Sequence, residues 1–255
     1  MRLAENELKE FLEEKYELYN RPSFIELDPV SIPHKFTHKE DREIAAFFSA
    51  TIAWGQRPTI LKNANKLMEL MDNEPYNFIM NSEKGDWKRF EKFVHRTFQH
   101  TDVIYFIRSL QNIYSHHGGL EKVFADKSKK DVKEGIQHFR KIFLEIDPAG
   151  RTTKHISNVE KNASAKRINM FLRWMVRNDK RGVDFGIWKN ISPALLYCPL
   201  DLHSGRVARK LGLLKRPQDD WKAVNELTIN LRTLDKKDPV KYDFALFGLG
   251  VFEKF

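Results

Sequence analysis

The sequence predicts an all-α protein built from two helical lobes. Apolar residues recur at spacings of three and four along most of the chain, which is the period of an amphipathic helix. No segment alternates apolar and polar residues for long enough to require a β-strand. The chain can also bury one large core or two small ones, because 41% of its 255 residues are hydrophobic.

The expected helices follow one another along the whole chain. The first covers residues 5–19 and ends at Asn20-Arg21-Pro22, and the second, over 37–52, begins with the capping signal Thr37-x-x-Glu40. The same period predicts further helices over 58–71, 87–94, 102–114, 120–124, 131–146, 164–177, 202–213, 221–233 and 239–249. Clusters of Gly, Pro, Asn and Asp mark the longer loops, at 72–75, 117–119, 147–150 and 179–186. We treat residues 1–255 as one unit of two lobes, with a hinge near 147–153.

Composition excludes several kinds of site. Cys198 is the only cysteine, so one chain cannot form a disulfide, a Cys-rich zinc site or a four-cysteine iron–sulfur cluster. The apolar neighbours Leu195-Leu196-Tyr197 indicate that Cys198 is a buried thiol rather than a nucleophile. The histidines lack metal-binding spacing, and no P-loop or dinucleotide fingerprint occurs. We therefore expect neither a metal nor a cofactor.

The N-terminus and the hydropathy pattern predict where in the cell the protein is found. Residues 1–7 are charged where a secretory signal would be apolar, and no run of apolar residues is long enough to span a bilayer. We expect a cytoplasmic protein with no membrane partner.

Positive charge is concentrated in one quarter of the chain. The 44 Lys and Arg residues and 35 Asp and Glu residues give a net charge of +9. Between Arg151 and Arg216, fifteen basic residues stand against four acidic ones, a net charge of +11, so the remainder nets −2. Such an excess is typical of a surface that neutralises nucleic-acid phosphates, although a solvated basic face also produces it.

One segment carries the most specific pattern. Pro199-Leu200-Asp201-Leu202-His203 is followed by Arg206-Val207-Ala208-Arg209-Lys210-Leu211-Gly212-Leu213. This resembles the segment P-V-D-T-H-V-x-R-V-x-x-R-L-G-L of the helix-hairpin-helix (HhH-GPD) DNA glycosylase superfamily, whose aspartate is the catalytic acid. The chain is similar to a divergent bacterial branch of that superfamily, and Asp201 falls on the catalytic position. An acid directly ahead of a helix is also an ordinary N-cap, so both interpretations of Asp201 stay open.

Three further segments occur in the family's order. Ser164 to Leu172 resembles G-R-K-T-A-N-x-x-L, the helix after the hairpin, and Lys166 falls on the Schiff-base lysine of bifunctional members. Phe48 to Arg57 resembles I-L-S-Q-Q-T, and Gln56 falls on the glutamine that faces the lesion. Residues 238–250 resemble the closing helix, so the likeness covers roughly residues 38–250.

The chain departs from the family pattern in three places. The hairpin L-P-G-V-G corresponds to residues 159–164, which contain no glycine, so phosphate contact would fall to the Ser164 amides and the charge of Lys161. Thirty-five residues separate Lys166 from Asp201, about twice the usual length, as in the archaeal 8-oxoguanine glycosylase branch. The C-terminal four-cysteine cluster is missing, as it is in many members.

The resemblance implies a base-excision-repair glycosylase that hydrolyses the N-glycosidic bond of a damaged base in double-stranded DNA. Asp201 would stabilise positive charge on the sugar or activate water, and an uncharged Lys166 would attack C1′ to add AP-lyase activity. Such an enzyme extrudes its base, which could stack on Trp54, Phe171, Trp174 or Trp188 if these are not core residues. The expected DNA contacts are Trp54, Gln56, Arg57, Lys161, Ser164, Arg167, Asn169, His203 and Arg206. This function implies association with the nucleoid.

Two other classes of function remain open. A non-catalytic nucleic-acid-binding protein could keep the glycosylase fold without the glycine hairpin. A protein-interaction scaffold would show no salt-dependent DNA affinity. Lys166 would then be an ordinary surface lysine.

Overall fold

The structure is a computed structural model that describes residues 4–146 and 150–255. The chain divides into two compact units, one formed by residues 25–157 and the other by residues 1–24 together with 158–255. We call them the central unit and the terminal unit. Residues 147–149 of the expected hinge lie outside the described residues, while residues 150–153 begin a 3-10 helix in the central unit.

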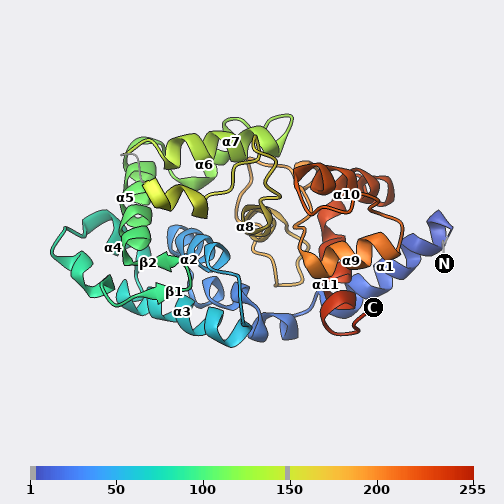
Figure 1. Ribbon diagram of the computed structural model, residues 1–255, viewed down its shortest axis with the longest axis horizontal. Helices are drawn as coiled ribbons and strands as arrows, with labels where there is room; N and C mark the ends of the chain where they lie inside the picture. Colours follow the sequence, from blue (N-terminus) through green and yellow to red (C-terminus); the bar gives the residue numbers. More distant parts are fainter. Residues whose placement is uncertain (1–3, 147–149) are drawn as a thin grey trace. The chain divides into compact units, whose positions relative to one another are not determined.

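Helices dominate the described part of the chain, which confirms the all-α prediction at the level of fold class (Figure 1). The central unit contains α2 (Lys39–Thr51), α3 (Arg57–Leu70), α4 (Pro75–Asn81), α5 (His100–His116), α6 (Leu120–Ala125) and α7 (Val132–Phe143). Its short 3-10 helices are η2 (Pro29–Ser31), η3 (Pro33–Lys35), η4 (Asp86–Phe90) and η5 (Gly150–His155). The 3-10 helix η1 (Pro22–Leu27) contains the boundary in sequence between the two units, at residues 24 and 25.

The core of the central unit is a cluster of phenylalanine rings. Phe47 of α2 contacts Phe106 of α5 and both Phe139 and Phe143 of α7, with ring centroids 5.5 Å apart in each pair. All four side chains are fully buried. Full burial of a phenylalanine stabilises a fold by about 1.5–3 kcal/mol, so these rings hold the three helices together.

The segment before α5 differs from the prediction of a helix over 87–94. The chain forms η4 and then a two-residue antiparallel pair, β1 (Val94–His95) and β2 (Phe98–Gln99). Between these strands Arg96 takes a left-handed conformation with φ of 55°, which makes a tight turn. The helical spacing of the apolar residues here comes from packing, because Phe90, Phe93 and Phe98 all point into the core.

The terminal unit contains α1 (Glu5–Tyr19), α8 (Lys166–Val176), α9 (Leu202–Lys210), α10 (Trp221–Leu234) and α11 (Asp243–Val251). The 3-10 helices η6 (Pro193–Leu195) and η7 (Pro239–Tyr242) precede α9 and α11. Among them α11 is apolar on nearly all sides and is buried from Asp243 to Leu246, as expected of a central helix. It packs against both α1 and α9 (Figure 1).

Two glycines let the neighbours of α11 approach closely. A Cβ on Gly248 would lie 2.1 Å from the ring of Tyr19 in α1, and a Cβ on Gly250 would lie 3.0 Å from the Cβ of His203 in α9. The first distance requires the Tyr19 side chain to shift, and the second requires α9 to give by a few tenths of an ångström. The glycines therefore allow Tyr19 of α1 and the start of α9 to pack directly on α11.

Candidate active site

Lys166 and Asp201 meet in the terminal unit. The Lys166 Nζ lies 2.8 Å from the Asp201 Oδ2, and their side chains are 32% and 16% exposed. The two residues start two different helices, since Lys166 is the first residue of α8 and Asp201 is the N-cap of α9. The structure thus brings together the two residues that the sequence assigns to catalysis.

The backbone of α9 holds Asp201 in one orientation. Its Oδ1 accepts hydrogen bonds from the His203 amide at 2.8 Å and the Ser204 amide at 2.9 Å, while its own amide donates to the Ser204 Oγ at 3.0 Å. This is a reciprocal cap, so the N-cap interpretation is correct for Oδ1. Oδ2 extends toward Lys166, which leaves one carboxylate oxygen for the pair.

Asp201 is held in its charged form. Burial by itself would raise the pKa of the Asp201 carboxyl, but the charge and hydrogen bond of Lys166 and the hydrogen bonds of Ser204 lower it below its usual value. The carboxylate therefore carries its negative charge throughout the neutral range, as a group that stabilises a cation must.

Lys166 has an unfavourable position for an ordinary surface lysine. The N-terminus of a helix carries a partial positive charge and favours acids, yet the first turn of α8 contains Lys166 and Arg167 and no acid. Burial lowers the pKa of Arg167 to about 10, which still leaves it charged at neutral pH. Two adjacent cations at this helix start are better explained by an anionic partner than by helix stability.

The loop before α8 reaches its shape without glycine. Asn162 has a φ of 64° and Ala165 has a φ of 51°, both in the left-handed region. The side chain of Asn162 donates to the Asp220 Oδ2 at 2.7 Å, and its carbonyl oxygen accepts from the Trp221 amide at 3.1 Å. These bonds tie the loop to the start of α10. Lys161 is exposed in this loop, and Ser164 is half-buried.

Asn169 behaves differently from an exposed DNA contact. It is 1% exposed, and its side-chain amide donates to the Ser164 carbonyl oxygen at 3.2 Å. In this conformation Asn169 closes the turn into α8 and offers no surface to a ligand.

The start of α9 presents a continuous exposed face beside Asp201. His203 and Arg206 are exposed, and the Arg206 guanidinium donates to the Gly250 carbonyl oxygen at 3.2 Å. Leu202 is 73% exposed, and the sequence analysis did not assign it a role. Leu202 directly follows Asp201, which the family resemblance places at the catalytic position, and this neighbourhood could have identified Leu202 as a site residue.

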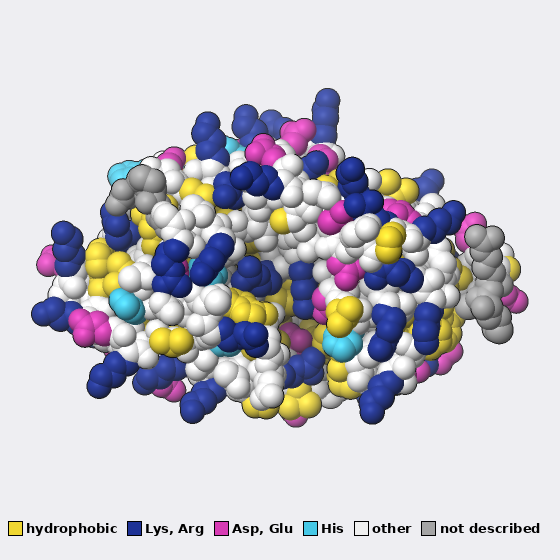
Figure 2. Space-filling model, in the orientation of Figure 1, with side chains coloured by type: hydrophobic (Ala, Val, Ile, Leu, Met, Phe, Trp, Pro, Cys, Tyr) yellow, Lys and Arg dark blue, Asp and Glu magenta, His cyan; other side chains and the backbone are white. Residues whose placement is uncertain are grey.

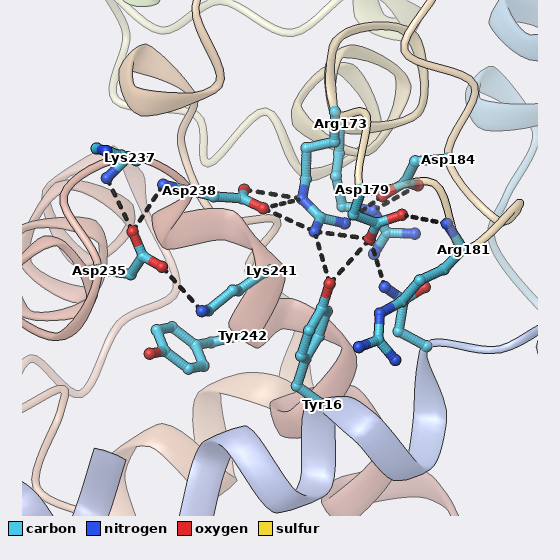
Figure 3. A network of polar contacts seen from close by, with 12 residues as sticks. Tyr16, Arg173, Asp179, Arg181, Asp184, Asp235, Lys237, Asp238, Lys241 and Tyr242 are labelled. Atoms are coloured by element: carbon cyan, nitrogen blue, oxygen red, sulfur yellow. Dashed lines mark hydrogen bonds and ion pairs between the residues drawn. The ribbon is translucent and has the colours of Figure 1, made fainter. Parts of the chain in front are cut away.

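A buried charge network lies along α8 (Figure 3). Arg173 bonds to Asp184 at 3.3 Å and to Asp243, while Arg177 bonds to Asp184 at 2.5 Å and to Asp238 at 2.8 Å. The network reaches α1 through Tyr16, whose hydroxyl donates to the Asp179 Oδ2 at 3.0 Å (Figure 3). Sequence reasoning missed it, because its charges come from segments far apart in the chain.

The remaining predicted residues lie in the central unit. Gln56 is the exposed N-cap of α3, and Arg57 is the half-buried first residue of that helix. Trp54 is half-buried, and its ring lies edge-on to His95 at 5.0 Å and stacks on His155 at 6.1 Å.

Three of the four aromatic residues considered for base stacking are core residues. Phe171, Trp174 and Trp188 are at most 1% exposed. Only Trp54 among the four has exposed surface in the described conformation.

The basic excess between Arg151 and Arg216 is partly internal. Arg173 and Arg177 are buried and neutralised, and Arg209 and Arg216 pair with Asp219 and Asp220 just beyond the segment. On the face shown in Figure 2, basic side chains are interspersed with acidic ones. The segment therefore contributes less free surface charge than its composition indicates.

Other kinds of site find no support in the described residues. Within residues 4–146 and 150–255, no three His, Cys, Asp or Glu side chains are grouped closely enough to hold a metal ion. Burial raises the pKa of the Cys198 thiol well above its usual value, which fits an inert core residue. Two surface pockets are lined only by central-unit residues and include no predicted site residue. No helix in the described part of the chain is long and apolar enough to cross a membrane.

Fold and site together define a mainly helical protein with a lysine–aspartate pair between two helix starts. The chain belongs to the family described as "Protein of unknown function (DUF2400)", whose family model matches residues 28–252. No curated protein and no solved structure matches the chain in comparisons of sequence and structure.

Proposed function

We propose that the protein is a glycosylase-like DNA repair enzyme that removes a damaged base, with Asp201 and Lys166 as its reacting groups. The observation that carries this proposal is the 2.8 Å contact between the Lys166 Nζ and the Asp201 Oδ2 at two helix starts. The resemblance of both segments to the helix-hairpin-helix glycosylases gives the pair its chemical interpretation. The family match over residues 28–252 covers both residues but names no activity.

The chemistry follows from the charges at the site. Breaking the bond between C1′ and the base leaves positive charge on the sugar, and the Asp201 carboxylate, negative at neutral pH, stabilises that charge. The departing base takes the bonding electron pair. Water then adds at C1′ in the monofunctional reaction, and Asp201 accepts its proton.

Lys166 adds a second route. For its amine to attack C1′, one ammonium proton must leave, and the Asp201 Oδ2 is an acceptor at hydrogen-bond distance. The amine replaces the base at C1′, the C1′–O4′ bond then opens to give a Schiff base while O4′ takes up a proton, and the Schiff base permits strand cleavage by elimination. Arg167, Lys161 and Arg206 supply positive charge for phosphates, and Leu202 supplies apolar surface beside the reacting carboxylate.

The test is single-turnover incubation with duplexes that carry uracil, 8-oxoguanine, an alkylated base or an abasic site. Borohydride is added to trap a Schiff base. We expect base release that Asp201→Asn reduces by about 10²–10⁴-fold, and a trapped adduct that disappears in Lys166→Gln. Lys215→Gln is the matched control, since Lys215 is an exposed lysine of the same unit. Full base release by Asp201→Asn would refute the mechanism.

A non-catalytic nucleic-acid-binding protein is the second candidate. The exposed cations Lys161 and Arg206 near the two helix starts favour it, because phosphate binding needs positive charge but no reacting group. Salt-dependent binding of every duplex, unaltered by Asp201→Asn and without base release, would select this function.

A further inference from the structure

Three cations form one stripe along α8. Lys166, Arg173 and Arg177 are separated by seven and four residues, so they lie on the same side of the helix. Each pairs with an aspartate from another segment, and exposure falls along the stripe from 32% for Lys166 to 5% for Arg173 and 0% for Arg177. The candidate active site is the exposed end of this stripe.

Arg173 joins three elements of the terminal unit. Its guanidinium bonds to Asp184 at 3.3 Å and to Asp243, the first residue of α11. It also lies over the ring of Phe244, 4.2 Å from the centroid. These contacts set the rotation of α8 about its axis, which decides whether Lys166 two turns earlier faces the start of α9.

Asp243 is electrically coupled to the reacting pair. The pKa of Asp243 is raised to about 6, because burial and the charge of Asp201 raise it by more than the charges of Arg173 and Lys166 lower it. Arg173 of α8 contacts Asp243 directly, and the charges of Lys166 in α8 and Asp201 at the start of α9 also act on it, while Asp243 acts on the buried thiol of Cys198. Because such coupling is mutual, the charge of Asp243 also acts on Asp201 and Lys166.

Stability alone does not account for the pair. Buried ion pairs cost desolvation that their attraction seldom exceeds, and well-packed apolar residues of similar volume are often as stable. As whole residues, Arg173 is 4% exposed and Asp243 is 6% exposed, so this argument applies to them. A role at the neighbouring site explains their presence better.

We propose that Arg173 and Asp243 are positioning residues of the Lys166–Asp201 site. Arg173 fixes the rotation of α8 that brings Lys166 to Asp201, and Asp243 holds Arg173 in place from the start of α11. The inference rests on the proposed function in so far as Lys166 and Asp201 are the reacting groups. It extends that function by naming residues that act on the pair from the core.

The first experiment needs neither DNA nor activity. The intact protein is labelled at pH 8 with a limiting amount of an amine-reactive ester, and the labelling of each lysine is measured by peptide mass spectrometry. In Asp243→Asn we expect Lys166 to react about threefold faster, because Arg173 loses one of its two partners and the start of α8 is held less firmly against Asp201. Lys241, 15% exposed and paired elsewhere, is the internal reference for general loosening.

Asp238→Asn is the matched control variant. Asp238 belongs to the same network but pairs with Arg177, at the inner end of the stripe. Its substitution is expected to leave Lys166 labelling unchanged. Unchanged Lys166 labelling in a folded Asp243→Asn variant, or an equal increase in both variants, would overturn the proposal.

A second measurement on the wild-type protein covers the case in which Asp243→Asn does not fold. The carboxyl carbon resonance of Asp201 is followed by NMR as pH is lowered. We expect a step near pH 6, where Asp243 gains its proton. A single transition at the low pH of Asp201 itself would overturn the coupling. A protein that shows the coupling but releases no base would refute the proposed function and leave this inference in place.

Discussion

Asp243 makes the stability of the protein depend on pH in a way that can be calculated. Its pKa rises from 3.8 to about 6 on folding, because the folded protein buries the carboxyl. The raised pKa means that the folded state keeps a proton that the unfolded state releases between about pH 4 and 6. The contribution of Asp243 to the free energy of unfolding is therefore fully present below pH 4 and is lost as pH rises through 6.

The size of this effect follows from the shift. About two pKa units at 1.36 kcal/mol each amount to about 3 kcal/mol. Asp243→Asn removes the titration and nearly preserves the shape of the side chain, while Asp184 remains as a partner for Arg173. Relative to the variant, the wild-type protein is thus expected to lose about 2 kcal/mol of this total between pH 4 and pH 6.5.

Urea unfolding at half-unit intervals of pH measures this difference. Subtracting the two proteins cancels the other titrating groups, as long as the variant keeps the slope of unfolding free energy on urea concentration. A difference between wild type and variant that stays constant from pH 4 to 6.5 would refute the reasoning. It would mean that Asp243 is charged in the folded state throughout this range.

Three further outcomes follow from the same structure. Asp201→Ala should destabilise the protein by about 1 kcal/mol more than Asp201→Asn, because Asn can still cap α9. Urea unfolding measures this difference, and equal losses of stability in the two variants would argue against the cap. Although Asp102 is buried, its pKa is lowered to about 2 by the His155 imidazole, whose Nε2 lies 3.4 Å from the Asp102 Oδ2, and by hydrogen bonds from the Gln99 amide and the Thr152 hydroxyl. Acid should therefore remove its stabilisation between about pH 4 and 2; Asp102→Asn should flatten the acid-unfolding curve, and an unaltered curve would contradict this. Gly248→Ala should cost about 1–3 kcal/mol by displacing Tyr19, measured by thermal unfolding. Gly85→Ala is the control, because Gly85 is exposed and a Cβ there would meet nothing within 4 Å; an unchanged midpoint in Gly248→Ala would show that α1 and α11 separate easily.

The helices were predictable because their signals are local. The expected range 202–213 contains α9, and Asp201 as N-cap could be inferred from its position ahead of that helix. The helix α4 was missed because Pro75 was taken as the end of a loop, whereas proline is well suited to the first turn of a helix. The helix expected over 87–94 was wrong because packing, rather than backbone periodicity, sets the spacing of the apolar side chains there.

The reacting pair could be predicted from the sequence, but the residues that surround it could not. Lys166 and Asp201 were identified because each lies in a short pattern that can be compared with a family. Asp243 lies in an ordinary apolar segment, 70 residues from its partner Arg173. No local pattern connects two such residues, so only the folded arrangement of α8 and α11 shows that they meet.

The loop at residues 159–164 has no glycine, but it still adopts the backbone conformation for which glycine is usually required. Glycine matters in a phosphate-binding hairpin because it permits a left-handed backbone and bare amides. Asn162 reaches the left-handed region, with a φ of 64°, and asparagine is among the non-glycine residues that do so most readily. Its side chain is also occupied by bonds to the start of α10, which hold the loop in that conformation without a ligand. The backbone turn that glycine would supply is therefore available here, and what the loop has lost is the free space of a residue without a side chain.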